Sequence, residues 1–105
     1  MRILYKEPFK DAVVKDIGGS LQDIQELVGG YFQTVPIIPE SRVLVLCNEE
    51  GKLLDLKPNI MLPYDVIVGN IMLMAMDGEE LVGLSEQEIK IFTEYLGKID
   101  ISKME

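Results

Sequence analysis

The stretch that decides the fold is residues 42–77, RVLVLCNEEGKLLDLKPNIMLPYDVIVGNIMLMAMD. It contains two apolar runs, 43–47 and 66–76, which hold β-branched residues and are bounded by turn residues. Runs of this kind are typical of strands that are covered on both faces. The connection between them carries the densest group of polar side chains in the chain, so we expect a binding site to lie beside it.

The residues before this stretch predict a hairpin, a helix and a strand. Segments 1–6 and 11–17 read as two strands that pair across a turn. Ser20 caps a helix whose apolar stripe ends at Gly29–Gly30. Segment 31–35 is rich in strand-forming residues. Because a helix this short is marginal alone, we expect it to dock on the sheet.

We expect the polar connection to be irregular. A four-residue turn at 48–51 would place Gly51 at positive φ, and a short return strand would follow at 52–54. Segment 55–63 contains two prolines and predicts a loop across the sheet edge. The residues 64–76 then predict the longest strand of the chain.

The C-terminal part predicts a bulge, a hairpin and a second helix. Gly69, inside the long strand, indicates a bulge or the close approach of another backbone. Asp77-Gly78 is a hairpin turn signal. The motif SEQE at 85–88 is a capping box. Gly97 stands where the helix is expected to end, and 97–105 is expected to be a polar tail.

These elements predict an α+β fold, with a mixed, mostly antiparallel sheet and two helices packed on it. A chain of 105 residues forms one domain, 1–105, and buries roughly two thirds of its unfolded surface. The N-terminus lacks the apolar core of a signal peptide, and the run 66–76 is shorter than the ~20 residues that span a bilayer. We expect a soluble protein in the host cell cytoplasm.

The chain is acidic, with 18 acidic and 10 basic residues and a net charge of −8. Such a chain is repelled by phosphate backbones, so direct binding to nucleic acid is disfavoured. The simplest role of this charge is solubility. The alternative is a surface that imitates DNA or attracts a basic partner. Its candidate face comprises Asp77, Glu79, Glu80, Glu86, Glu88 and Glu94.

The absence of histidine and the single cysteine exclude most catalytic constellations. Zinc sites of the Cys/His kinds and Ser-His-Asp or Cys-His centres cannot form. Cys47 lies in an apolar strand and is expected to be a buried structural thiol. Asp55, Asn59 and Asp65 do not have the spacing of a calcium loop. We therefore expect no metal, no cofactor and no enzymatic activity, with hydrolysis by carboxylates as the least supported reading.

The run Ile71–Met76 requires apolar cover on both faces of its strand. The helices supply one cover, and either the rest of the sheet or a second copy of the protein supplies the other. Methionine adapts its shape, so it suits a core as well as an interface. We favour a core, with homo-oligomerisation as the second possibility.

Four segments together resemble a known family: SLQDIQELVGGY at 20–31, CNEEGKL at 47–53, LKPN at 56–59 and DVIVG at 65–69. They are similar to a family of small proteins classified only as domain of unknown function 3846. The resemblance implies a phage or mobile-element context, in which small acidic proteins often act against host defence. It implies no catalytic role. The family pattern marks Gly29, Gly30, Asn48, Glu49, Glu50, Gly51, Lys52, Asn59, Asp65 and Gly69.

Polar groups at strand ends beside an apolar wall fit a small-molecule pocket, and they equally fit turn geometry with Lys52 pairing Glu50. The first hypothesis is a non-enzymatic binding protein, a homo-oligomer that sequesters a small nucleotide-derived signal. The expected ligand-binding residues are Tyr31, Asn48, Glu49, Glu50, Lys52, Asn59, Tyr64 and Asp65. Lysine would contact phosphate, the asparagines would read a base or ribose, and a tyrosine would stack. The alternative is an acidic interaction protein that binds a basic host protein.

Overall fold

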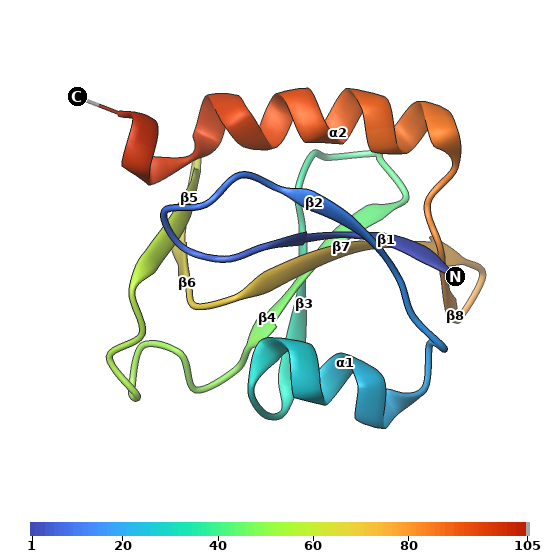
Figure 1. Cartoon of the computed structure of the whole chain (residues 1–105), viewed down its shortest axis with the longest axis horizontal. Coiled ribbons are helices and arrows are strands. Elements are labelled where there is room, and N and C mark those ends of the chain that lie inside the picture. The colour runs from blue at the N-terminus through green and yellow to red at the C-terminus, as the bar shows by residue number, and fades with distance from the viewer. Residues whose placement is uncertain (105) are drawn as a thin grey trace.

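The computed structural model describes residues 1–104 and has an α+β fold, as the sequence predicts (Figure 1). The central sheet has the strand order β2-β1-β7-β4-β3, with β8 beside the end of β7, and β5 and β6 form a separate two-stranded sheet. All pairings are antiparallel. The elements are β1 Arg2–Lys6, β2 Val13–Asp16, α1 Leu21–Val28, β3 Phe32–Pro36, β4 Val43–Asn48, β5 Pro58–Leu62, β6 Asp65–Val68, β7 Ile71–Asp77, β8 Glu80–Val82, α2 Glu86–Ile99 and the 3-10 turn η1 Ile101–Lys103.

Strand β7 lies in the middle of the large sheet and is covered on both faces by its own chain. Ile71, Leu73 and Ala75 are buried in one apolar cluster with residues of α2. Met72 and Met74 are buried in a second cluster with residues of α1. The two helices lie on opposite faces of the sheet (Figure 1). The cover predicted for this run is therefore internal, and a second copy is not required to bury it.

The N-terminal elements follow the sequence closely. Strands β1 and β2 pair antiparallel, as expected for the predicted hairpin. The Ser20 hydroxyl accepts a hydrogen bond from the Asp23 amide at 3.1 Å, which caps α1. Gly29 ends the helix in the left-handed region with φ 84°. These signals are local, so packing elsewhere does not override them.

The prediction for the turn after β4 was wrong in two respects. Residues 49–55 form one continuous turn without the return strand expected at 52–54. The residue with positive φ is Asp55, at 56°, and Gly51 is not in the left-handed region. Gly51 is needed for space instead, because a Cβ atom there would lie 2.8 Å from the Val68 methyl group Cγ2. The glycine permits the turn to pack closely on β6.

The predictions for 55–63 and 64–76 were also wrong. Residues 58–62 are not a loop but strand β5, which pairs with β6. Pro58 is tolerated because it is the first residue of that strand. The expected long strand is divided between β6 and β7 at Gly69, whose φ is 80°. The chain turns there from the small sheet into the large one.

The second helix begins where the capping box predicts, at Ser85 and Glu88, but it continues to Ile99. Gly97 is therefore inside the helix, and the expected polar tail begins as helix and contains the buried Asp100. Glu105, the last residue of that tail, lies outside the described residues. Within residues 1–104, neither helix is long and apolar enough to cross a membrane.

Two glycine substitutions test these packing assignments with opposite signs. We expect Gly51→Ala to destabilise the protein by about 1–3 kcal/mol, because overpacking costs this much in a closed site. We expect Gly97→Ala to stabilise it by about 0.5–1 kcal/mol, since the new methyl group meets only the Lys103 ammonium, at 3.9 Å, and alanine favours a helix interior. Urea unfolding of both variants measures this. Equal signs would contradict the assignments.

Candidate functional site

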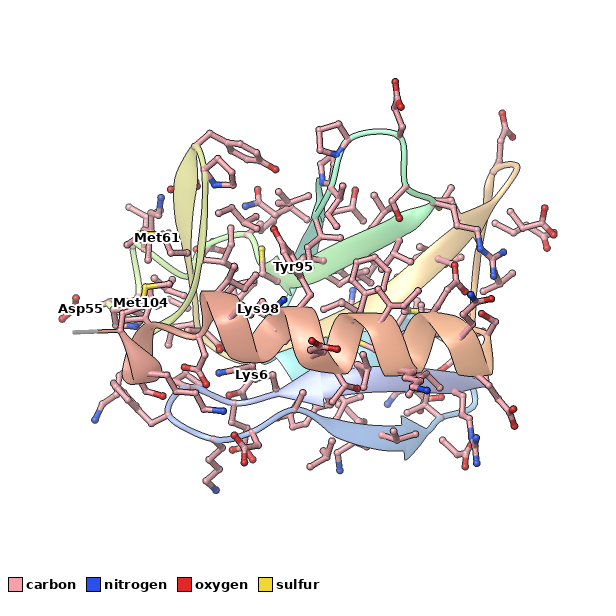
Figure 2. The ribbon with its side chains drawn as sticks, turned by 90° about the horizontal axis from the view of Figure 1, so that it is seen from above. Lys6, Asp55, Met61, Tyr95, Lys98 and Met104 are labelled. Atoms are coloured by element: carbon pink, nitrogen blue, oxygen red, sulfur yellow. The ribbon has the colours of Figure 1, made fainter. Side chains whose placement is uncertain are left out.

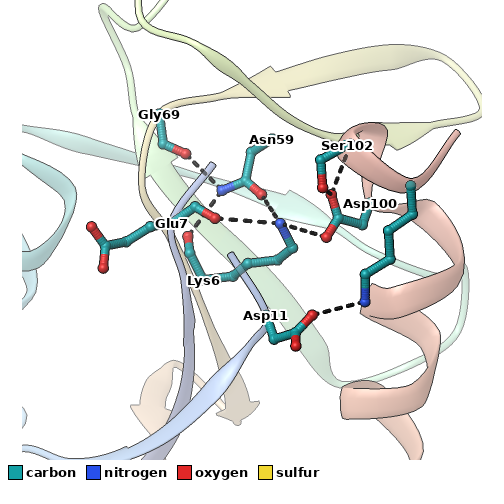
Figure 3. Close-up of polar contacts among 8 residues, drawn as sticks. Lys6, Glu7, Asp11, Asn59, Gly69, Asp100 and Ser102 are labelled. Atoms are coloured by element: carbon teal, nitrogen blue, oxygen red, sulfur yellow. Dashed lines mark hydrogen bonds and ion pairs between the residues drawn. The ribbon is translucent and has the colours of Figure 1, made fainter. Parts of the chain in front are cut away.

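A buried lysine joins the two sheets and the C-terminal segment. The Lys6 side chain is 1% exposed. Its Nζ atom donates to Asn59 Oδ1 at 2.6 Å and to the Glu7 carbonyl oxygen at 3.4 Å, and it lies 3.2 Å from Asp100 Oδ2 (Figure 3). The ammonium group thus makes two hydrogen bonds and one ion pair. Burial of this charge is tolerated because an anion and two further oxygens face it.

The partners of Lys6 are themselves held by further contacts. Asn59 is fully buried and donates from Nδ2 to the carbonyl oxygens of Lys6, at 2.9 Å, and Gly69, at 2.8 Å. Asp100 Oδ1 accepts from the amide and the hydroxyl of Ser102. Burial raises the pKa of Asp100, but hydrogen bonds from Ser102 and Lys6 outweigh it and hold the pKa below its ordinary value. This Lys6 network uses both N–H groups and one acceptor site of the Asn59 amide, which is fully buried, so Asn59 is not available to a ligand.

Asn48 also has a structural role. It is 6% exposed. Its Oδ1 atom accepts from the Glu50 amide at 2.8 Å and its Nδ2 atom donates to the Val28 carbonyl at 3.4 Å. It therefore joins the turn after β4 to the end of α1. The side chains of Glu49 and Glu50 are exposed.

Lys52 pairs with Asp65, not with Glu50, and the pair is exposed. The hydrogen bond from Lys52 holds the pKa of Asp65 below its ordinary value. The pair borders a pocket of about 100 Å³. Gln33, Cys47, Asn48 and Gly51 also line this pocket. Drug-sized ligands occupy roughly 300–1,000 Å³, so this pocket is too small for a nucleotide. Burial raises the pKa of the Cys47 thiol, which makes it a poor nucleophile.

Neither predicted stacking tyrosine lines this pocket. Tyr31 is 68% exposed, and its carbonyl oxygen accepts from the Glu49 amide. The Tyr64 hydroxyl donates to the Pro36 carbonyl at 2.5 Å, which ties the tip of the small sheet to the end of β3. The structure thus brings four of the predicted ligand residues together at this pocket: Asn48, Glu49, Lys52 and Asp65. The other four, Tyr31, Glu50, Asn59 and Tyr64, are not part of its lining.

A larger groove lies on the other side of Asn48, between the turn after β1, the end of α1 and the segment 54–57. Its volume is about 410 Å³, within the range of small-molecule sites. Pro8, Phe9, Val28, Leu54 and Leu56 form its apolar part, and Glu7, Gly29, Asn48, Lys57, Gly69 and Asn70 complete it. We refer to this cavity as the Phe9 groove.

The Phe9 groove presents an aromatic ring, a cation and an amide. Phe9 is 56% exposed and has φ 67°, a region that aromatic residues rarely adopt. The Lys57 ammonium lies 5.8 Å from the centre of the Phe9 ring and pairs with no carboxylate of residues 1–104. The Asn70 side chain has no hydrogen-bond partner among those residues. Strain and unpaired polar groups gather at functional sites, so this groove is the strongest candidate.

Sequence reasoning missed Phe9, Lys57 and Asn70. The turn signal at Pro8 was visible, but nothing in the sequence indicates that this turn and residues 54–57 meet. They meet because the pairing of β5 with β6 brings Lys57 next to Gly69, whose amide donates to the Lys57 carbonyl at 2.8 Å.

The predicted acidic face is mixed in sign. Arg42 donates two hydrogen bonds of 2.8 Å to Glu88, which lower the pKa of Glu88 to about 2. Glu94 lies 3.7 Å from the Lys98 ammonium. The other four residues of this face, Asp77, Glu79, Glu80 and Glu86, form no ion pair within residues 1–104.

A family model described as domain of unknown function (DUF3846) matches residues 1–97, which is most of the chain. No curated protein and no solved structure is significantly similar to it. The family match includes the Lys6 network up to Asn59 and every residue of the Phe9 groove.

Removal of the buried ammonium tests the Lys6 network. We expect Lys6→Met to cost on the order of 3–5 kcal/mol in the free energy of unfolding, because it leaves Asp100 buried without a counter-charge. The matched control is Lys52→Met, which breaks the exposed pair with Asp65 and should change stability little. Chemical denaturation of both variants decides. Equal losses would show that burial of the Lys6 pair is not important.

The pKa of Asp100 predicts a dependence of stability on acid. Its pKa is below the ordinary 3.8, so the charged carboxylate stabilises the fold above pH 3.8, and this contribution is lost as pH falls through the folded-state pKa. We expect Asp100→Asn to be less stable than wild type at pH 7 and to lose less stability on acidification. Thermal unfolding between pH 7 and pH 2 measures both. Parallel curves for the two proteins would contradict this role.

Proposed function

This chain belongs to the family described as domain of unknown function (DUF3846), and on that premise we propose that it is a non-enzymatic binding protein of a phage or mobile element. In this proposal it is a homo-oligomer that sequesters a small nucleotide-derived signal of host defence. The ligand occupies the Phe9 groove. The observation that carries the proposal is the exposed ring of Phe9, a residue with positive φ, in a partly apolar groove beside Lys57, which forms no ion pair within residues 1–104.

Each part of a nucleotide has a matching group in the Phe9 groove. A base stacks on the Phe9 ring, because every base has a π-face that favours an aromatic side chain. The Lys57 ammonium attracts a phosphate, and the Asn70 amide donates to and accepts from a base edge or ribose. The Glu7 carboxylate accepts from an exocyclic amine or a sugar hydroxyl. These residues take the roles that we expected of Lys52, Asn59 and a tyrosine.

The net charge of −8 opposes the approach of an anion. The opposition is weaker at the groove, because Glu7, its one carboxylate, lies 3.7 Å from the Lys10 ammonium. Lys57 can therefore attract a phosphate at short range, where dissolved salt screens the attraction little. We expect the affinity for the ligand to fall only partly as the ionic strength rises.

A second candidate function rests on the turn between β7 and β8. Asp77, Glu79 and Glu80 are exposed there and form no ion pair with residues 1–104. Such a group suits a basic host protein. Exposed charge contacts are screened by salt, so binding of this kind fails at high ionic strength, whereas stacking in an apolar groove persists.

Native mass spectrometry tests the proposed ligand directly. The protein is purified gently from cells that carry an active defence system, and we expect a discrete extra mass. Phe9→Ala should reduce retention roughly 5- to 150-fold, since base–aromatic stacking is worth on the order of 1–3 kcal/mol. Lys57→Ala should also reduce retention, because it removes the cation that attracts the phosphate.

The matched control is Lys52→Ala, which removes a lysine of the neighbouring small pocket and should retain the ligand. Loss of the extra mass in the control alone would place the ligand at the small pocket. A bare chain from such cells would favour the acidic turn, and co-purification with a basic host protein would then be the next measurement.

A further inference from the structure

The outer edge of β2 is exposed along its whole length. All four of its residues are exposed, and the side chains of Val13 and Val14 are 49% and 46% exposed. The strand lies at the margin of the sheet, outside the area that α2 covers (Figure 2). The opposite margin, β3, ends in a proline, Pro36, and Tyr64 is bonded to it. Proline and covering contacts protect strand edges, and β2 has neither within residues 1–104.

The backbone of β2 offers free hydrogen-bonding groups at defined positions. Met1 and Ile17 exchange two backbone hydrogen bonds, of 2.8 and 2.9 Å. Bonded and non-bonded pairs alternate along an antiparallel ladder, so Lys15 also directs its N–H and C=O toward β1. Val14 and Asp16 direct theirs outward. The outward-facing N–H and C=O groups are therefore those of Val14, whose β-branched side chain is exposed, and of Asp16.

The lysine of β2 does not shield the edge. An edge lysine normally discourages pairing because its charge must be desolvated. The Lys15 ammonium instead lies 5.2 Å from the centre of the Tyr5 ring, over the neighbouring strand β1. Asp16 stands opposite Arg2 in the register of β1 and β2. The Lys15 charge thus has a π-face within its own chain, and Asp16 stands opposite a residue of the other sign.

We propose that β2 pairs antiparallel with β2 of a second copy, around a two-fold axis at Val14. The outward-facing backbone groups of β2 belong to Val14 and Asp16. In a two-fold pair of strands, Val14 can bond to Val14, Val14 to Asp16, or Asp16 to Asp16 of the other copy. These three pairings place the axis at Val14, Lys15 and Asp16, respectively. An axis at Lys15 or Asp16 places two like charges directly opposite, which is destabilising. An axis at Val14 places two valines opposite each other and sets Val13 against the aliphatic stem of Lys15 from the other copy. The charge pattern of the strand therefore selects this register.

This inference names the interface of the homo-oligomer in the proposed function, and in that part it rests on the proposal. The contact differs from the one suggested by the run 71–76, of which the chain itself buries residues 71–75. The Phe9 groove is not part of it. The mass of the assembly and the retention of a ligand are separate readouts, so either result can fail without the other.

Sedimentation velocity of the purified protein measures the assembly. We expect the wild type to sediment with twice the chain mass. Val14→Lys and Val14→Glu should each halve that mass, because each places like charges at the axis. An equimolar mixture of the two variants should restore the dimer, since Lys then faces Glu. Mixing restores the dimer only if residue 14 of one copy faces residue 14 of the other copy.

The control Lys90→Glu changes the charge of the exposed face of α2 and should leave the dimer intact. Circular dichroism verifies that each variant is folded. Should the charged variants unfold, Val14→Pro removes only an outward N–H, a change that edge strands tolerate, and it should also give the monomer. A monomeric wild type, a dimer that persists in folded Val14→Lys, or a mixture that remains monomeric would overturn the proposal.

Discussion

The arrangement of this fold depends on one buried ammonium group. Lys6 contacts Asn59 of the small sheet and Asp100 after α2, and Asn59 in turn donates to the carbonyl of Gly69, which lies between β6 and β7. These contacts connect residues that are 53 and 10 positions apart. Glu7, Lys57 and Asn70 of the Phe9 groove each lie within two residues of a member of the network. The Lys6 network therefore supports the segments that form the groove. Asn59, which the sequence suggested as a ligand-binding residue, has a structural role in this support.

The parts of the fold that could be predicted from the sequence are those fixed by local chemistry or by strong apolar patterns. The caps at Ser20 and Ser85 and the end of α1 at the Gly29–Gly30 pair depend on residues within one turn, and all were predicted. The strand pair β5–β6 was missed because its two prolines suggested a loop, whereas Pro58 occupies the one strand position that suits it. Gly97 was misread for the opposite reason. A favourable local end signal was overridden because Phe92 and Leu96 pack on the sheet and the Asp100 carboxylate is held by Lys6.

The candidate site could be predicted only in its neighbourhood. The polar connection after β4 borders both cavities through Asn48, so the predicted and the proposed site lie at the same end of the sheet. They differ in their side chains, because Lys52 and Asp65 pair with each other and Asn59 is enclosed. Phe9, Lys57 and Asn70 come from three segments whose proximity is produced by the packing of the two sheets. Periodicity and spacing in a single sequence do not indicate that these three segments lie close together in the fold.

The most direct test of ligand binding in the Phe9 groove is a nuclear magnetic resonance titration of isotope-labelled protein with a panel of nucleotides, from mononucleotides to cyclic dinucleotides. It observes the backbone amides together, so it separates the groove from the small pocket and from the acidic turn. Binding in the groove predicts shifts that centre on the amides of Phe9, Lys57 and Asn70 for at least one member of the panel. Shifts confined to Lys52 and Asp65, or no shift with any nucleotide, would contradict it.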